Sequence, residues 1–504
     1  MRAEFRSTPL PPPLLQFNMA AHVLRHAPAQ PDKLALQVVR PTGAERWSYA
    51  RLEAAVRGAG AGMAARGLAP GDRVLLRLGN TPEFPVAFLG AIAAGFVPVP
   101  TSSQLTRAEI TKMAADVAPA LVIAGEGIAL PDHPAPVVTE AELRGFEALA
   151  PCDYVLGDPE RLAYLVFTSG TSGRARAVAH AHRAIWARQM MYQGWYGISE
   201  ADRLLHAGAF NWTYTLGTGL MDPWAVGASA LIPGAGVEPA QIPLLLKRFD
   251  ATIFAAAPGV YRQILKHHDR LALPRLRHGL SAGEKLPETT RSRWNAASGT
   301  MIYEALGMSE CSTFISGSPA RPAPEGASGY PQEGRRIAVL DVEGAVVDRG
   351  QPGTLAVHAS DPGLFLGYFN APEETASRFF GEWFVTGDTV AMAEDGAIAY
   401  LGRDDDMMNA GGFRVSPLEV EAAMATCPGA GEVAAIELRI KEEASVIALA
   451  YTGTAPDATL RAHAEAVLAR YKQPRIYAHL PALPHNANGK INRRALRLDW
   501  PVKE

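Results

Sequence analysis

The sequence predicts an α/β protein: a large N-terminal domain of parallel-type sheets covered by helices, a β-rich subdomain, and a small mobile α+β C-terminal domain. Apolar strands alternate with helical segments through the first part of the chain, short strands with tight turns begin near residue 334, and two helices flank a strand pair after residue 403. Alternating strands and helices are typical of parallel sheets covered on both faces. A chain of 504 residues also exceeds one compact core, so at least two domains are expected.

The elements follow from local patterns. GDRVLLRL (71–78) reads as a strand entered from a turn, EFPVAFLGAIAAG (83–95) as a helix ended by glycine, and ALVIAG (120–125) as a buried strand. The same alternation predicts strands in RLLHAGAF, ASALIP, ATIFAAAP and RHGLSAGE. RRIAVLDVEGAVVDRG carries a Glu-Gly hairpin turn, and helices are expected near 417–426 and 460–471. Three successive aspartates at 404–406 are unfavourable in a core, so we divide the chain into domains 1–403 and 404–504.

Composition limits the function classes. Hydrophobic residues form 48% and charged residues 20% of the chain, as in globular proteins. A net charge of −3 gives no reason to expect nucleic acid or an anionic membrane as a partner, so a small-molecule substrate is the default. Three scattered cysteines form no metal or disulfide pattern, and prolines at 9 and 11–13 interrupt any export signal, so a cytoplasmic location is expected. The apolar runs are too short to span a membrane.

The strongest local signal is YLVFTSGTSGRARAV (164–178), followed by a segment at 179–189 that reads as a helix. Glycines and hydroxyl side chains offer backbone N–H and O–H donors to a polyphosphate, and Arg174 and Arg176 add positive charge. The Gly-Lys-[Ser/Thr] ending of a Walker loop is missing, which disfavours a P-loop NTPase. The alternative is an ordinary flexible connection between a strand and a helix.

This loop resembles the phosphate-binding signature of the adenylate-forming superfamily, which includes acyl-CoA synthetases, peptide-synthetase adenylation domains and luciferases. Further segments similar to that family follow in the expected order: LGMSEC (306–311), WFVTGD (383–388), YLGRDDDMMNAGGFRVSPLEVE (400–421) and NANGKINRRAL (486–496). The resemblance covers nearly the whole chain. It implies an enzyme that activates a carboxylic acid with ATP to an acyl-adenylate and pyrophosphate, then transfers the acyl group to coenzyme A.

The resemblance also implies residue roles. Transfer of adenylate brings anions together, so cations must neutralise the phosphates: Glu310 is the expected Mg²⁺ carboxylate, and Lys490 and Arg176 are further catalytic residues. Asp388 would accept from the ribose hydroxyls, and Arg403 and Arg414 would contact the ribose and phosphate regions. The residues expected at the nucleotide are Thr168, Ser169, Gly170, Thr171, Ser172, Gly173, Gly283, Glu284, Leu306, Gly307, Met308, Ser309, Asp388, Arg403 and Arg414.

The small domain is implied to rotate between the two half-reactions, with Asp405 at the hinge. Gly411 and Gly412 would then face the path of coenzyme A, where missing side chains permit close approach. A plain hairpin turn is the alternative reading of this glycine pair.

Three positions depart from the family pattern. Ala175 and Arg176 stand where Pro-Lys is common, Leu306 replaces a frequent aromatic residue, and Asn409 replaces a common lysine. None of these changes removes an indispensable charge, so activity is expected.

SAGEKLPETTRSRW (281–294) and YTLGTGLMDPWAVGAS (214–229) look closest to the benzoate-CoA ligase branch. Bulky Trp212 and Tyr214 would shorten the acyl pocket and favour an aryl or short acyl acid, unless they are core aromatics. The expected pocket residues are Phe210, Asn211, Trp212, Tyr214, Gly217, Ser281, Ala282 and Phe314. Two other functions stay open: loading of a separate carrier protein, and an inactive nucleotide-binding homologue. A homodimer is one oligomeric state considered.

Overall fold

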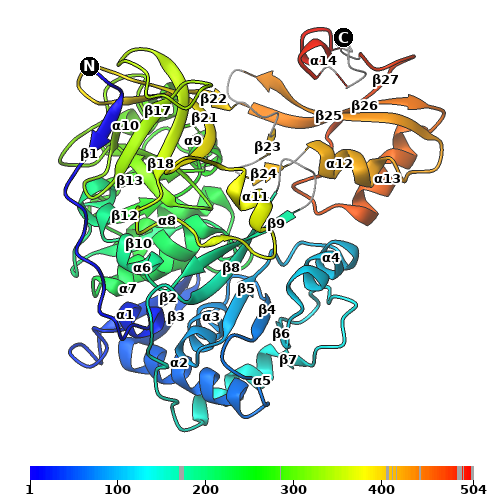
Figure 1. Ribbon diagram of the computed structural model, residues 1–504. Helices are drawn as coiled ribbons and strands as arrows, with labels where there is room; N and C mark the ends of the chain where they lie inside the picture. The colour runs from blue at the N-terminus through cyan, green and yellow to red at the C-terminus, as the bar shows by residue number, and fades with distance from the viewer. Residues whose placement is uncertain are drawn as a thin grey trace.

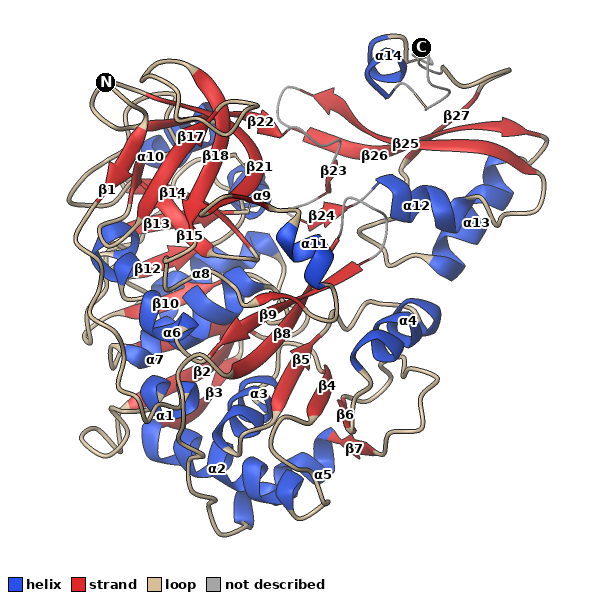
Figure 2. Ribbon diagram, in the orientation of Figure 1, coloured by secondary structure: helices blue, strands red, loops and turns tan. Residues whose placement is uncertain are grey.

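The computed structural model describes residues 1–169, 175–283, 285–403, 408–410, 413–415, 417–441, 444–484, 491 and 493–500 (Figure 1). It forms a large α/β body and a smaller C-terminal region on one side of that body (Figure 2). This arrangement confirms the predicted fold class. Several residues predicted to be functional lie outside the described residues: Gly170, Thr171, Ser172, Gly173, Glu284, Asp405, Gly411, Gly412 and Lys490.

A nine-stranded sheet forms the centre of the large body, and its strands from β14 to β2 run parallel. The strands, in sheet order, are β16 (Tyr330–Pro331), β15 (Ser312–Ser316), β14 (Met301–Met308), β13 (His278–Ala282), β12 (Ile253–Ala255), β10 (Arg203–His206), β11 (Ser229–Pro233), β2 (Leu34–Arg40) and β3 (Gly43–Ser48). The associated helices are α6 (Ala184–Ala187), α7 (Asp222–Ala225), α8 (Ile242–Arg248), α9 (Pro258–His267), α10 (Glu288–Ser298), the π-helices η2 (Tyr192–Tyr196) and η3 (Thr215–Met221), and the 3₁₀ turn η4 (Pro239–Gln241). The four strands predicted in this region are confirmed.

A second, parallel sheet lies in the N-terminal part: β5 (Val97–Pro100), β4 (Arg73–Arg77), β6 (Leu121–Ala124) and β7 (Val137–Thr139). The helices of this part are α1 (Met19–Val23), α2 (Tyr49–Ala64), α3 (Glu83–Ala93), α4 (Arg107–Val117) and α5 (Glu140–Gly145), with the 3₁₀ turn η1 (Phe146–Ala148). Helix α3 is buried along its whole length, and Gly95 follows it with a φ of 83°. Only glycine adopts this conformation without strain, which confirms the predicted helix end.

The segment after the phosphate loop differs from the prediction. The sheet of β19 (Gly367–Tyr368), β9 (Ala175–Ala181) and β8 (Leu162–Ser169) is antiparallel, and β9 extends through His180. The predicted helix over 179–189 is therefore wrong except for the short α6. Cross-strand pairing explains the difference: His180 lies opposite Tyr164, and the two rings stack with centroids 4.8 Å apart. Such pairs outweigh the helical preference of alanine.

The β-rich part is an antiparallel sheet of β1 (Glu4–Arg6), β17 (Arg336–Leu340), β18 (Pro352–His358), β21 (Trp383–Met392), β20 (Phe379–Phe380) and β22 (Ile398–Arg403), with helix α11 (Pro372–Ala376) nearby. It confirms the short strands predicted after residue 334. The predicted hairpin turn is also present, with Gly344 at a φ of 82°.

The C-terminal region has a core of its own. The hairpin of β23 (Met408–Ala410) and β24 (Phe413–Val415) precedes α12 (Pro417–Met424), β25 (Ala430–Lys441), β26 (Ala444–Gly453), α13 (Asp457–Val467), β27 (Ile476–His479) and α14 (Arg493–Leu498). Met408, Val420, Leu449 and Leu460 meet in its core. The second predicted helix begins and ends earlier than expected. The domain boundary after residue 403 stays a prediction. Over the described part of the chain, every helix is too short or too polar to cross a membrane.

Candidate active site

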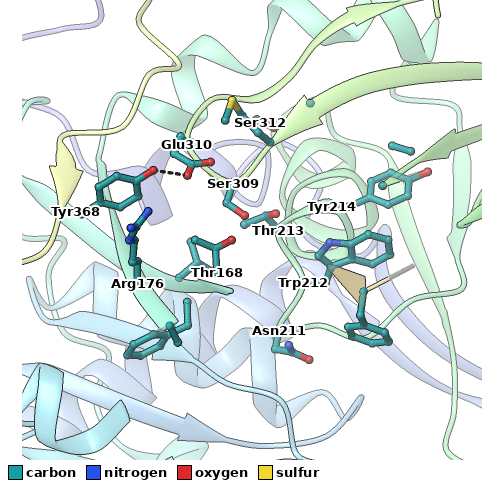
Figure 3. A pocket seen from close by; sticks show the side chains of 18 of the residues that line it. Thr168, Arg176, Asn211, Trp212, Thr213, Tyr214, Ser309, Glu310, Ser312 and Tyr368 are labelled. Atoms are coloured by element: carbon teal, nitrogen blue, oxygen red, sulfur yellow. Dashed lines mark hydrogen bonds between the residues drawn. The ribbon is translucent and has the colours of Figure 1, made fainter. Parts of the chain in front are cut away.

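A cavity of about 220 Å³ lies where the large body meets the C-terminal region (Figure 3). Strands β8, β9, β14 and β15, the loop before η3, and residues of the C-terminal region contribute to its wall. Eleven of the residues predicted to be functional line it: Thr168, Arg176, Asn211, Trp212, Tyr214, Ala282, Gly283, Gly307, Met308, Ser309 and Glu310. Segments far apart in the sequence therefore converge on one space.

Glu310 is buried at the wall of this cavity and is held by two contacts. The Tyr368 hydroxyl donates to Glu310 Oε1 over 2.8 Å, and the Phe365 amide donates to the Glu310 carbonyl over 2.7 Å. Burial, and then the Glu310 charge, raise the pKa of Tyr368, so its hydroxyl stays a donor. The Tyr368 hydroxyl thus gives the carboxylate a fixed direction at the cavity wall.

A hydrogen bond from β9 positions the turn that carries Ser309 and Glu310. His180 Nε2 lies 2.8 Å from the Ser309 carbonyl oxygen and donates to it. Burial lowers the pKa of His180 to about 4, so the ring is neutral near pH 7. Gly307 packs so tightly against the Ser312 and Thr313 backbone that a Cβ at this position would collide with it. Only glycine fits there, which agrees with its place in the adenylate-contacting segment.

Arg176 brings positive charge to the same side of the cavity as Glu310. It lies directly across from Thr168 in the β8–β9 pair, forms an ion pair with Glu374, and has its guanidinium carbon 5.3 Å from the centre of the Tyr368 ring. Figure 3 shows Arg176, Tyr368 and Glu310 together on one side of the cavity and Trp212 and Tyr214 on the other. The cavity therefore has a charged side and an aromatic side.

The aromatic side of the cavity requires glycine at position 283, next to the Trp212 ring. Gly283 has a φ of 98°, and a Cβ there would lie 2.5 Å from the Trp212 ring. Trp212 and Tyr214 pack edge to face with centroids 5.3 Å apart, and the buried Tyr214 donates to the Leu280 carbonyl. Tyr214 is thus both a core residue and a cavity residue, whereas half-buried Trp212 faces the cavity.

The C-terminal region closes the cavity. The Phe413 ring stacks on Trp212 with centroids 6.3 Å apart and on Tyr471 with centroids 4.2 Å apart. Buried Lys472 binds Glu419 at 2.6 Å and Glu109 of the large body at 3.4 Å. Burial would lower the pKa of Lys472, but Tyr471 and these two carboxylates raise it above its ordinary value, so the lysine remains charged.

Several other predicted residues are not among the described residues that line the cavity, and the side chains of Arg403 and Arg414 lie outside the described part of the structure. Leu306 is half-buried on β14, and Asp388 is buried on β21 opposite Arg403 of β22. The backbones of Arg403 and Arg414 belong to β22 and β24. Four predicted acyl-pocket residues are buried behind the wall: Phe210, Gly217, Ser281 and Phe314. Their roles stay predictions.

Sequence reasoning missed several cavity residues, notably Met113, Tyr368, Arg378, Phe413, Tyr471 and Lys472. Of these, Phe413 lies in the family-like segment 400–421, and the other five lie in no pattern whose spacing indicates chemistry. A closer reading of GYFN (367–370) could have drawn attention to Tyr368 as an aromatic residue between turn-forming positions.

Glu310 is the carboxylate expected to bind Mg²⁺ at this cavity. Across the described part of the chain, no three His, Cys, Asp or Glu side chains gather into a metal site. Mg²⁺, however, is commonly held by one or two carboxylates together with substrate phosphates and water. A single oriented carboxylate at Glu310, on the same side of the cavity as the Arg176 guanidinium that suits phosphate, fits that mode of binding.

Comparison with known proteins agrees with this geometry. The family model described as AMP-binding enzyme matches residues 23–369, and that described as AMP-binding enzyme C-terminal domain matches residues 419–490. A benzoate–CoA ligase of Thauera aromatica is 32% identical over 89% of this chain and 90% of that protein. A 3-hydroxybenzoate–CoA ligase of Aromatoleum sp. (strain CIB) is 30% identical over 90% and 92%.

Solved structures give the same picture. A benzoate CoA ligase from Burkholderia xenovorans LB400 superposes with a TM-score of 0.72 at 27% identity, covering 95% of this chain and all of that one. An o-succinylbenzoate CoA synthetase from Bacillus subtilis has a TM-score of 0.85, covering 96% and 98%; at 21% identity this likeness concerns the fold alone.

These matches confirm the expected resemblance to the adenylate-forming superfamily near its benzoate-CoA ligase branch, and with it the prediction of an AMP-forming ligase. The first family model alone spans well over half of the 504 residues. This protein therefore belongs to the family of AMP-binding enzymes.

Proposed function

We propose that the enzyme is an acid–CoA ligase that activates an aryl or short acyl carboxylic acid with ATP and then transfers the acyl group to coenzyme A. The observation that carries the proposal is the cavity itself, where Arg176, Thr168, Ser309 and Glu310 form a charged side opposite the aromatic Trp212. Its relatives named as benzoate– and 3-hydroxybenzoate–CoA ligases support the same reaction.

In the first half-reaction, a carboxylate oxygen of the acid attacks the α-phosphorus of ATP, and the bond to pyrophosphate breaks. The hydroxyls of Thr168 and Ser309 and the guanidinium of Arg176 are placed to bind phosphate oxygens. Mg²⁺ would supply charge neutralisation at the phosphates, with Glu310 as its protein carboxylate. Asp388 and Arg403 would bind the ribose, and Lys490 and Arg414 the phosphate and carboxylate region.

In the second half-reaction, the thiolate of coenzyme A attacks the acyl carbonyl carbon and AMP leaves. Domain alternation would withdraw Lys490 and bring Gly411 and Gly412 to the thiol path, with a hinge at Asp405. The contacts of Phe413 and Lys472 with the large body support a role for the C-terminal region in closing the site.

The aromatic wall supports a flat or short acid. Trp212 rests on Gly283 and is covered by Phe413, which leaves room beside the adenylate for a ring rather than a long chain. An enzyme that prefers long-chain fatty acids would contradict this part of the proposal.

The experiment is pyrophosphate release from ATP over a panel of aryl and short aliphatic acids, with and without coenzyme A. Acid-dependent release with formation of the CoA thioester is the expected result. Accumulation of adenylate despite coenzyme A would favour loading of a carrier protein, and no response to any acid would favour an inactive homologue.

A lysine pair tests the residue roles. Lys490→Ala should lower adenylate formation by about 10²-fold or more, the cost of removing one preorganised donor from a transition state. Exposed Lys247 on α8 gives the matched control, since Lys247→Ala removes a similar charge far from the cavity lining. Equal rates for both variants would refute the role of Lys490.

The proposal also covers the cellular location and the oligomeric state of the enzyme. The three cysteines are free, which suits a reducing compartment such as the cytoplasm. A homodimer is proposed as the oligomeric state, and light scattering of the purified protein tests it.

A further inference from the structure

Ser312 occupies an unusual position on the cavity wall. It is the first residue of β15, two positions after Glu310, and it lines the cavity. Its φ of 64° is in the left-handed region, which a residue with a side chain seldom adopts. Strained backbone of this kind concentrates at functional sites, where the surrounding structure holds it in place.

A buried ion pair lies directly behind this serine. Arg188 is 7% exposed and Asp222 fully buried, and Arg188 donates to both Asp222 oxygens over 2.8 and 2.6 Å. The same guanidinium donates to Tyr196 Oη over 3.2 Å and to Ser312 Oγ. The Ser312 hydroxyl therefore connects the buried Arg188–Asp222 ion pair to the cavity wall.

The ion pair fixes the direction of that hydroxyl. A guanidinium has donors and no acceptor, so Ser312 Oγ must accept from Arg188 and its own hydrogen must point elsewhere. Within the described part of the chain, Ser312 has no second hydrogen-bond partner. Because the side chain lines the cavity, the remaining direction for its hydrogen is the cavity itself.

Arg188 also links this serine to the region of the predicted acyl pocket. Its guanidinium packs against Gly217, where a Cβ would collide with it, and Gly217 belongs to η3, the helix that follows Trp212 and Tyr214. Asp222 neutralises the arginine charge, so the wall presents a polarised O–H and not a free cation. A second carboxylate at this donor would be buried without a counter-charge, so an uncharged oxygen suits it better.

We propose that Ser312, oriented by Arg188, is a specificity-determining residue whose hydroxyl donates a hydrogen bond to a ring oxygen of the acid. The substrate class is then an aryl acid that bears a hydroxyl or alkoxy group. This inference rests on the proposed function and narrows its substrate.

The test compares kcat/KM for benzoate with that for the 2-, 3- and 4-hydroxybenzoates and their methoxy analogues. At least one oxygen-substituted acid should exceed benzoate in the native enzyme. Ser312→Ala and Ser312→Gly should each lower the ratio of kcat/KM for that acid to kcat/KM for benzoate about tenfold. In both variants the ring oxygen of the substrate is buried without a hydrogen-bond donor, which costs binding energy. The glycine variant removes the backbone strain as well, so agreement between the two variants isolates the hydroxyl.

Ser316→Ala is the matched control on the same strand. Ser316 binds the Gly194 carbonyl and Gln332 away from the cavity, so its loss should leave the ratio unchanged. Unchanged ratios in both Ser312 variants would overturn the inference while leaving the ligase proposal intact, and so would a native preference for benzoate or for a dicarboxylic acid. If no acid supports pyrophosphate release, the proposed function itself fails.

Discussion

Replacement of Arg188 by leucine should cost the large body a substantial part of its stability. The substitution leaves the Asp222 carboxylate fully buried with the Tyr196 hydroxyl as its remaining donor. Breaking one side of a buried ion pair costs roughly 3–5 kcal/mol, because the partner charge stays desolvated. Burial alone would lower the pKa of Arg188, but Asp222 raises it above its ordinary value, so the guanidinium stays charged.

The expected shift in melting temperature follows from size. With an unfolding entropy of roughly 2.1 cal/mol/K per residue over about 400 residues, a loss of about 4 kcal/mol lowers Tm by about 5 °C. Differential scanning calorimetry at pH 7.5 measures this shift. The double variant R188L/D222L should lose less than either single variant, since it leaves no unpaired charge.

Acidification gives an independent check on the mechanism. In R188L the buried Asp222 should have a raised pKa, so the folded state binds a proton more readily than the unfolded chain. The stability deficit should then shrink by up to about 1.4 kcal/mol per pH unit as the pH falls below that raised pKa. A deficit that is small, additive in the double variant, and independent of pH would refute the reasoning.

Two further outcomes are expected. Tyr368→Phe removes the hydrogen-bond donor to Glu310, so the rate of adenylate formation should fall about tenfold and a higher Mg²⁺ concentration should be needed for the half-maximal rate. Pyrophosphate release measured against Mg²⁺ concentration tests both effects. An unchanged Mg²⁺ dependence would contradict the positioning role of Tyr368. Burial lowers the pKa of five histidines to about 3 or 4: His22, His180, His182, His206 and His278. Between pH 6.5 and 4 the unfolded chain binds more protons, so Tm should fall with pH in that window, and a constant Tm down to pH 5 would exclude this linkage.

The fold could be predicted well because its local and tertiary signals agree. The apolar run of α3 and the glycine after it require the same helix end, and the parallel strands read as continuous apolar segments. The end of β9 and the residues after it misled the prediction, since alanine-rich AHAHRAIWARQ (179–189) favours a helix locally. Pairing of His180 with Tyr164 across the sheet decides its conformation, and no local pattern contains that information.

The site was predictable only where one segment carries the chemistry. Ser309 and Glu310 lie in one short motif, and Arg176 ends another. Lys472 meets Glu109 across 363 positions, and Arg188 meets Ser312 across 124. Such pairs depend on how sheets and helices pack, so a reading of spacing along the chain does not reveal them.

Under the proposed function, the ring of Phe413 would link binding of the acid to closure of the site by the C-terminal region. The ring stacks on both Trp212 and Tyr471, so a ligand that displaces the indole would also disturb the contact of the C-terminal region with the large body. Linkage is reciprocal: an acid that favours the closed arrangement by a given factor is itself bound more tightly by the same factor once closure has occurred. Under the proposed function, one aromatic surface would therefore contribute both to selection among acids and to closure.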